Sequence, residues 1–130
     1  MRIQIKPDNE KAKALKKMAE ITLKRLEETD KEKYPSNTLT DYYDIIHKLM
    51  EATTIKEGIK IKGEGAHRQL IEHVVKKKNL NQQDSIFLQE MRDIRNRISY
   101  EGFTVNKNYI SLNIRKINRI VDILSSKVKR

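Results

Sequence analysis

Residues 91–102 read Met-Arg-Asp-Ile-Arg-Asn-Arg-Ile-Ser-Tyr-Glu-Gly. Their apolar side chains stand at Met91, Ile94 and Ile98, and Phe87 extends the series towards the N-terminus. This spacing of four, three and four residues predicts one apolar face of an α-helix. Three arginines lie between the apolar positions, and the closing glycine predicts the end of the helix. We expect the segment to pack on one side and to present guanidinium groups to an anion.

Four further helices are predicted from the same periodicity. With the arginine-bearing helix they are expected at about 8–30, 38–58, 66–78, 83–101 and 108–126. The second has the widest apolar stripe and is expected to be central. The short connections favour an all-α, five-helix, up-and-down antiparallel bundle that forms a single domain, 1–130. Residues 1–7 are compatible with an extended arm but are too few to predict a strand.

The composition limits the class of protein. The chain has 130 residues, of which 37% are hydrophobic and 35% charged, so we expect a modest core that can fold as one domain. There is no cysteine, which excludes disulfides and thiolate metal ligands. No signal peptide and no apolar run of the ~20 residues that a membrane span needs is visible, so we expect a cytoplasmic protein.

The net charge is +10, and much of it is concentrated near the C-terminus. Residues 107–130 contain seven lysines or arginines and one aspartate, a net charge of +6. Such a distribution favours contact with phosphates or acidic partners. The alternative is a surface rich in lysine and glutamate whose charges largely pair with one another.

The arginine-bearing helix offers candidate binding residues. On a helical wheel, Arg92, Asn96 and Tyr100 form one row, whereas Arg95 and Arg97 flank the apolar face on either side. A guanidinium is a rigid fork of donors that suits a phosphate. The alternative is ion pairing with nearby acids, namely Asp93, Glu90 or an acid of another helix.

The three histidines carry weaker signals. His47 lies on the wide apolar stripe, where a buried or interface residue with a polar partner is expected. His67 and Arg68 follow the turn at 63–65, and a glycine turn before a helix can hold a phosphate. His73 falls on another face. No carboxylate completes a ligand set around these histidines, so we assign neither a metal nor a cofactor.

The series Asp93, Arg95, Asn96, Tyr100 and Gly102 resembles the signature of the HEPN superfamily of small helical domains. That signature is an arginine, often followed by asparagine or aspartate, four to six residues before a histidine. Tyr100 stands here where the family has histidine. The run Tyr-Tyr-Asp-Ile-Ile-His at 42–47 is similar to the aromatic second helix of the family, so that the resemblance covers about 38–124.

The resemblance implies two kinds of function. Many family members are metal-independent ribonucleases, often toxins paired with a nucleotidyltransferase-like antitoxin, and others bind nucleotides or act as non-catalytic partners. Most form homodimers in which the arginine-bearing helices face each other across a cleft. Residues five apart on a helix, such as Arg95 and Tyr100, diverge by ~140°. They converge on one phosphate only if the helix end distorts or a second subunit supplies the other half.

Tyrosine is a poor substitute for a catalytic histidine. Its pKa is about 10, against about 6.5 for histidine, and loss of a general acid or base typically lowers the rate ~10²–10⁴-fold. The leading hypothesis is therefore a module that binds RNA or a nucleotide, with weak or no catalysis. The runner-up is a metal-independent ribonuclease, and the third is a non-catalytic dimeric interaction domain. The candidate residues are Arg95, Asn96 and Tyr100 for catalysis and Arg92, Arg97, His67 and Arg68 for nucleic-acid binding.

Overall fold

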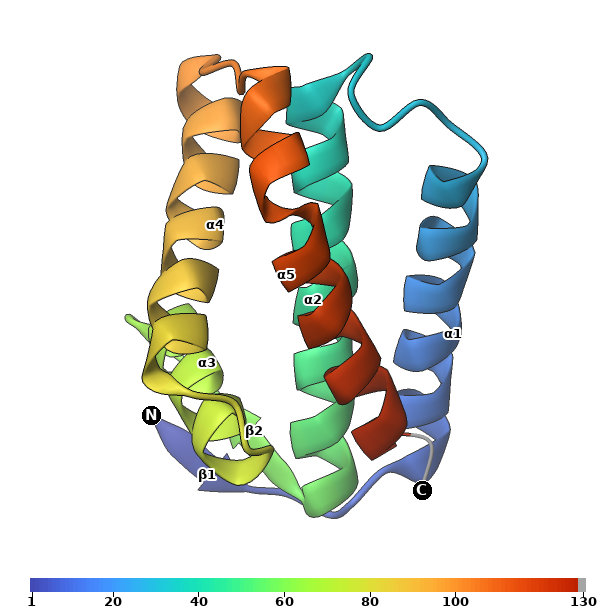
Figure 1. The fold of residues 1–130 in the computed structure, drawn as a ribbon. Coiled ribbons are helices and arrows are strands. Elements are labelled where there is room, and N and C mark those ends of the chain that lie inside the picture. The colour runs from blue at the N-terminus through green and yellow to red at the C-terminus, as the bar shows by residue number, and fades with distance from the viewer. Residues whose placement is uncertain (129–130) are drawn as a thin grey trace.

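The computed structural model describes residues 1–128 and contains five helices and one small two-stranded sheet (Figure 1). The elements are β1 (Arg2–Gln4), α1 (Asn9–Glu27), α2 (Pro35–Glu57), β2 (Ile59–Ile61), α3 (Ala66–Lys77), α4 (Gln82–Glu101) and α5 (Lys107–Val128). The five predicted helices are confirmed, each within about three residues of its expected ends. Lys129 and Arg130, which belong to the predicted basic segment, lie outside the described residues.

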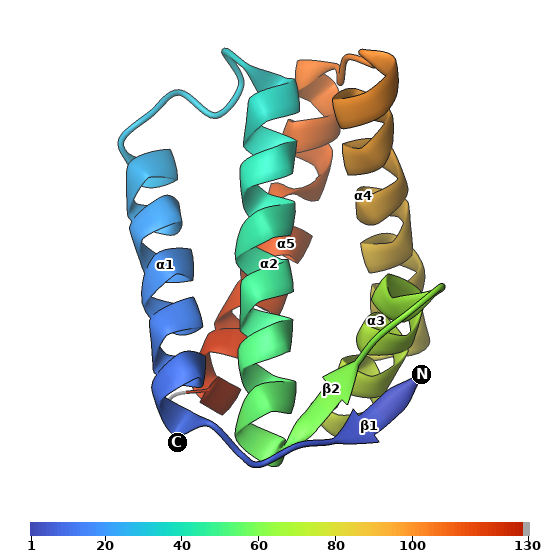
Figure 2. The ribbon, with the colours of Figure 1, turned by 180° about the vertical axis from the view of Figure 1, so that it is seen from behind.

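The four long helices alternate in direction along the chain, whereas α3 is a short helix beside the lower part of α4 (Figures 1 and 2). The central position predicted for α2 is confirmed, because α2 packs against all four other helices and against β2. Twelve of its side chains are buried, among them Leu39, Ile46 and Met50, which have no more than 1% of their surface exposed. None of the helices within the described range is both long and apolar enough to cross a membrane.

A small two-stranded sheet adds to the predicted helices, so the fold is mostly helical and not strictly all-α. β1 pairs antiparallel with β2, with Arg2 opposite Ile61 and Gln4 opposite Ile59. The backbone N–H of Ile5 then donates to the carbonyl of Gly58 at 2.9 Å. Each strand has only three residues, and its partner lies far away in the sequence, so neither local periodicity nor turn signals could predict the pairing.

The start of α2 is a second difference. We expected the helix to begin at Thr38, but it begins at Pro35, whose fixed φ angle suits the first helical position. Thr38 is buried within the first turn, and its hydroxyl donates to the carbonyl of Lys31 at 2.7 Å. The hydroxyl therefore fastens the preceding loop to the helix instead of capping it.

The arginine-bearing helix has well-defined ends. Asn81 and Asp84 form a reciprocal capping box at the start of α4, with N–H···O distances of 2.9 and 3.1 Å. Gly102 closes the helix with a φ of 69°, in the left-handed region that glycine tolerates. Met91 is buried, and Ile94 and Ile98 pack against the core, which confirms the predicted apolar face.

Candidate functional site

Two arginines of α4 are held one turn apart by the packed face of the helix. Arg92 and Arg95 follow the core residues Met91 and Ile94 in the sequence, so their side chains lie at the edge of the core. Each of the two arginine side chains is about one third exposed. Arg95 lies 3.5 Å from Asp44 of α2. Arg92 lies 4.0 Å from Asp93, a carboxylate that is 73% exposed. These pairs are long and partly solvated, so they neutralise the two guanidinium groups only weakly.

Aromatic and imidazole side chains of α2 and α3 complete the group. Tyr43 and His47 are one helical turn apart on α2, and their ring centroids lie 6.1 Å apart. His67, in the first turn of α3, stacks on His47 with a centroid distance of 4.8 Å and an interplanar angle of 26°. Gly65 has a φ of 74° and turns the chain into α3, which brings His67 over α2. We call Tyr43, His47, His67, Arg92 and Arg95 the arginine–histidine cluster.

Unpartnered polar atoms are concentrated in this cluster. Among the described residues, five buried side-chain nitrogen or oxygen atoms form no hydrogen bond. Four of them belong to the cluster: the hydroxyl of Tyr43, Nδ1 of His67 and Nε of both Arg92 and Arg95. Buried polar groups are nearly always hydrogen-bonded, and their concentration at one place is a feature of ligand sites. Because Arg has only donors and Tyr readily donates, the group is suited to an acceptor-rich anion.

The pKa values show that the charges of the cluster act on one another. Burial lowers the pKa of His47, Asp44 opposes this effect, and the positive charges of Lys48, Arg95 and Arg92 lower it further. Burial also lowers the pKa of His67, helped by His47 and the same two arginines. Both imidazoles are therefore mainly neutral at pH 7.

The hydroxyl of Tyr43 is held in its protonated form. Burial raises the pKa of Tyr43 to about 12, although the positive charges of Arg92 and Arg95 oppose the increase. Tyr43 is only 2% exposed, so its hydroxyl meets few water molecules. It is therefore available as a neutral donor throughout the physiological pH range.

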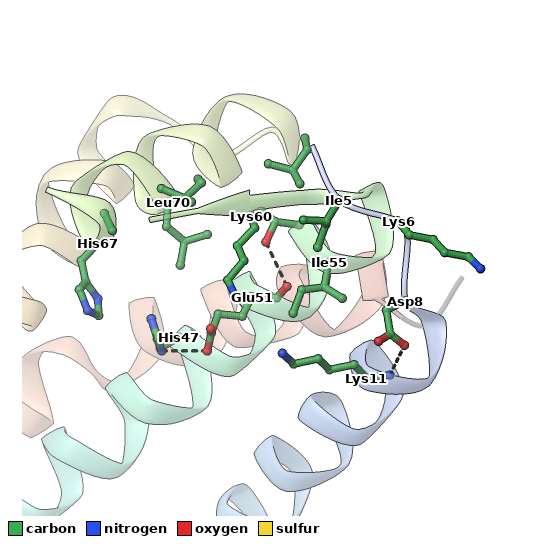
Figure 3. A pocket seen from close by; sticks show the side chains of 14 residues that line it. Ile5, Lys6, Asp8, Lys11, His47, Glu51, Ile55, Lys60, His67 and Leu70 are labelled. Atoms are coloured by element: carbon green, nitrogen blue, oxygen red, sulfur yellow. Dashed lines mark hydrogen bonds and ion pairs between the residues drawn. The ribbon is translucent and has the colours of Figure 1, made fainter. Parts of the chain in front are cut away.

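A pocket of about 400 Å³ adjoins the cluster (Figure 3). His47 and His67 form one end of the pocket, and Lys6, Asp8 and Lys11 line the opposite end. The walls between them come from α2, β2, α3 and the residue after β1, and include Ile5, Glu51, Ile55, Ile59, Lys60, Ile61, Ala66 and Leu70. The two imidazoles are thus shared between the cluster and the pocket.

The structure divides the predicted site residues into two groups. Arg92, Arg95 and His67 belong to the cluster. Asn96 follows Arg95 and is half-buried. Arg68 is exposed, and its carbonyl accepts from the side chain of Gln89 at 3.5 Å. The structure therefore brings three of the seven predicted residues together around one point.

Arg97 and Tyr100 lie apart from this point. The guanidinium of Arg97 lies over the ring of Phe103, 4.1 Å from its centroid, which is a cation–π contact. Tyr100 is 82% exposed. Because α4 remains helical as far as Glu101, the helix end does not distort in the way that would turn Tyr100 towards Arg95. Within one chain the two side chains diverge by ~140°.

Tyr43, Asp44 and His47 were not predicted as site residues. His47 was expected to be a buried or interface residue with a polar partner, and it is half-buried and 3.3 Å from Glu51. A usable signal was present, because Tyr43, His47 and Glu51 are spaced four residues apart and share one helix face. The apolar stripe of α2 is so wide that it concealed this polar row.

The described part of the chain, 1–128, has no grouping of three or more His, Asp or Glu side chains with the geometry of a metal site. The side chains of the cluster are guanidinium, imidazole and phenol groups. Comparison of the chain with protein-family models, with curated proteins and with solved structures gives no match.

Proposed function

We propose that this protein binds a phosphate group of RNA or of a nucleotide at the arginine–histidine cluster. The observation that carries the proposal is the convergence of four unpartnered buried polar atoms from α2, α3 and α4. A phosphate has acceptor oxygens on all sides and a negative charge, so it can pair with two guanidinium groups and a phenol at once. Protonation of either imidazole would add a further donor. The net charge of +10 supports the approach of an anionic ligand.

The ion-pair alternative is supported only in part. Arg95 pairs with Asp44 and Arg92 with Asp93, whereas Glu90 accepts from the hydroxyl of Tyr109 instead. At 3.5 and 4.0 Å these pairs leave Nε of both arginines without a partner. A purely structural role for the two arginines would be expected to use those donors.

Titration calorimetry with inorganic phosphate and with a short single-stranded RNA tests the proposal. We expect RNA binding to weaken as salt is added, because phosphate contacts release counterions. Replacing Arg92 and Arg95 together by alanine should weaken the binding of both ligands by roughly tenfold or more, since a hydrogen bond to a charged group contributes about 1.5–3 kcal/mol. Arg115→Ala on α5 removes an exposed guanidinium group outside the cluster and serves as the control for the loss of positive charge. Equal binding by the wild type and the double variant would refute the site.

Metal-independent RNA cleavage is a second candidate function, favoured by the stacked imidazoles beside two guanidinium groups. One neutral imidazole would remove the proton of the 2′-hydroxyl as this oxygen attacks the adjacent phosphorus. The other, once protonated, would give a proton to the leaving 5′-oxygen, and Arg95 would stabilise the phosphorane. In this version His47 and His67 perform the proton transfers that the sequence resemblance gave to Tyr100.

Cleavage of a labelled RNA in the presence of EDTA tests this candidate. We expect His47→Ala to lower the rate ~10²–10⁴-fold and Tyr100→Phe to leave it unchanged. If purified wild-type protein binds RNA but does not cleave it, the binding function stands alone. The homodimer and the nucleotidyltransferase-like partner implied by the family resemblance stay predictions, and analytical ultracentrifugation tests the first.

A further inference from the structure

The pocket next to the arginine–histidine cluster has the size of a small-molecule site. Its volume of about 400 Å³ lies near the lower end of the ~300–1,000 Å³ that ligand pockets occupy. A pocket of this size accommodates one base with its sugar but not two stacked nucleotides. Its lining residues come from α2, β2, α3 and the segment from Ile5 to Lys11 (Figure 3).

The lining combines flat and apolar surfaces. The stacked rings of His47 and His67 form one end. Ile5, Ile55 and Leu70 contribute aliphatic surface to the walls. A planar ring binds well between imidazole and aliphatic groups, because its faces are weakly hydrated.

The polar groups of the lining specify one edge of such a ring. Glu51 has an acceptor-only carboxylate, 3.3 Å from Nδ1 of His47 and 41% exposed. The side chains of Lys60 and Lys11 extend towards Glu51 in Figure 3 and bring ammonium donors to the same region. The pocket thus places an acceptor of two hydrogen bonds beside cationic donors.

We propose that the pocket binds a guanine base whose attached phosphate occupies the arginine–histidine cluster. This inference rests on the proposed phosphate-binding function. Guanine has two adjacent donors, N1–H and N2–H, which a carboxylate can accept together, and its O6 acceptor suits a lysine ammonium group. Adenine and cytosine each present one amino donor beside an unprotonated ring nitrogen, which would face Glu51 unfavourably. The imidazoles lie where the sugar joins the two parts of the ligand.

Calorimetry with GMP, AMP, CMP, UMP and inorganic phosphate tests the inference. We expect the wild type to bind GMP at least about tenfold more tightly than AMP or phosphate, the range that one bidentate base contact supplies. At pH 8, where both imidazoles are neutral and the pairing of Glu51 with His47 carries little charge, Glu51→Gln should abolish the preference for GMP over AMP and change phosphate binding little. The control is Glu64→Gln, which makes the same chemical change at an exposed position outside the pocket.

A second variant tests the pocket without altering its charge. Ala66 lines the pocket at the first position of α3 and is only half-buried, so Ala66→Leu adds volume there without removing core packing. We expect GMP to bind at least about tenfold more weakly to Ala66→Leu, while inorganic phosphate binds as before. Retained phosphate binding and an unchanged circular dichroism spectrum show that the variant is folded.

The outcomes separate this inference from the function on which it rests. If phosphate binds in a manner that depends on Arg92 and Arg95, but GMP binds no more tightly than phosphate, the guanine inference is wrong and the proposed function stands. If neither GMP nor phosphate binds, both fail.

Where GMP is preferred, a short RNA that ends in guanosine is compared with free GMP. The same RNA ending in adenosine and free AMP serve as the controls. Tighter binding of the RNA supports the proposal and assigns the ligand to an RNA end, whereas tighter binding of GMP supports it and assigns a free nucleotide.

Discussion

The imidazole rings of His47 and His67 are stacked 4.8 Å apart although they belong to α2 and α3. Burial is the main reason why the pKa values of both rings are lowered, and the positive charges of Arg92 and Arg95 lower them further. The contact therefore couples the packing of two helices to the protonation state of the site. Several measurable properties of the protein depend on this coupling.

The stability of the protein should decrease in mildly acidic solution. The unfolded chain has histidine pKa values of about 6.5, and those of His47 and His67 are lower in the folded protein. Between the two values the unfolded state binds more protons, so the free energy of unfolding falls as the pH decreases from about 6.5 through the folded pKa values. Urea unfolding at a series of pH values measures the effect. The double variant His47→Gln, His67→Gln should lose the part of this pH dependence that comes from these two rings and keep the part from His73, whose pKa burial also lowers. An unchanged profile would contradict the lowered pKa values of His47 and His67.

Binding of phosphate should have the opposite pH dependence. An anion in the cluster favours the protonated imidazoles and so raises the pKa of His47 and His67. The affinity for a phosphate monoester should accordingly increase as the pH falls towards the folded pKa values, in a range where the protein alone becomes less stable. Two-dimensional NMR of the imidazole protons, with and without ligand, reports both pKa values directly. Ligand binding that leaves both unchanged would place the anion elsewhere.

Asp44 should restrain anion binding. Its carboxylate lies 3.5 Å from Arg95 and would repel a phosphate at the same guanidinium. Partly exposed pairs of this kind contribute about 0.2–1 kcal/mol, so we expect Asp44→Asn to tighten phosphate binding by roughly two- to fivefold. Asp41→Asn removes a charge one turn earlier, where the partner is Arg25, and should leave phosphate binding unchanged. Weaker binding in Asp44→Asn would mean that the carboxylate orients Arg95 for the ligand.

Tyr43 should matter for binding but not for stability. Its buried hydroxyl forms no hydrogen bond in the protein, so Tyr43→Phe removes an unpaired polar atom and should leave the free energy of unfolding unchanged or slightly higher. Phosphate binding should weaken roughly three- to tenfold, because one donor to the anion is lost, equivalent to about 0.5–1.5 kcal/mol. Tyr100→Phe, at a position 82% exposed, should change neither property. Calorimetry and urea unfolding of the two variants distinguish these cases.

Asp84 should be the most sensitive acidic residue for stability. It is 1% exposed, caps α4 together with Asn81 and forms an ion pair with Arg119 of α5. The side chain of Arg119 is 47% exposed, so the main losses in Asp84→Ala are the helix cap and the hydrogen bond of a buried carboxylate, and the free energy of unfolding should fall by about 1–3 kcal/mol. Asp93→Ala, at an exposed position of the same helix, should remain within about 0.5 kcal/mol of the wild type. Similar values for the two variants would show that the capping box and ion pair contribute little.

The helices were predictable because their information is local. Apolar residues at helical spacing gave all five helices, and the wide stripe of α2 gave its central position. The two-stranded sheet was not predicted because strands of three residues carry no periodic signal. In addition, β1 and β2 can pair only because α2 places β2 next to residues 2–4. The predicted start of α2 was wrong because threonine is typical of helix N-caps and Thr38 was taken as the start. Pro35 is the residue that begins the helix.

The candidate site was predictable only in part for the same reason. Arg92 and Arg95 were identified because their spacing on one helix is visible in the sequence. The contact of His47 with His67 depends on how α3 crosses α2, which no local pattern encodes. The emphasis on Tyr100 came from the family signature, and the exposed position of its side chain places it outside the cluster.

The close approach at Gly58 makes the pocket wall depend on one missing side chain. Gly58 has a φ of 80°, and a Cβ atom there would lie 2.9 Å from the carbonyl oxygen of Ile5 and 3.1 Å from Pro7. Two short strands are only marginally stable by themselves, so the close contact of Gly58 with Ile5 and Pro7 helps to hold the two-stranded sheet against α2. A ligand that fills the pocket contacts β2 and would slow the opening of the two-stranded sheet. Exchange of the backbone amides of β1 and β2 with deuterium should therefore report ligand binding, although these amides do not bind the ligand themselves.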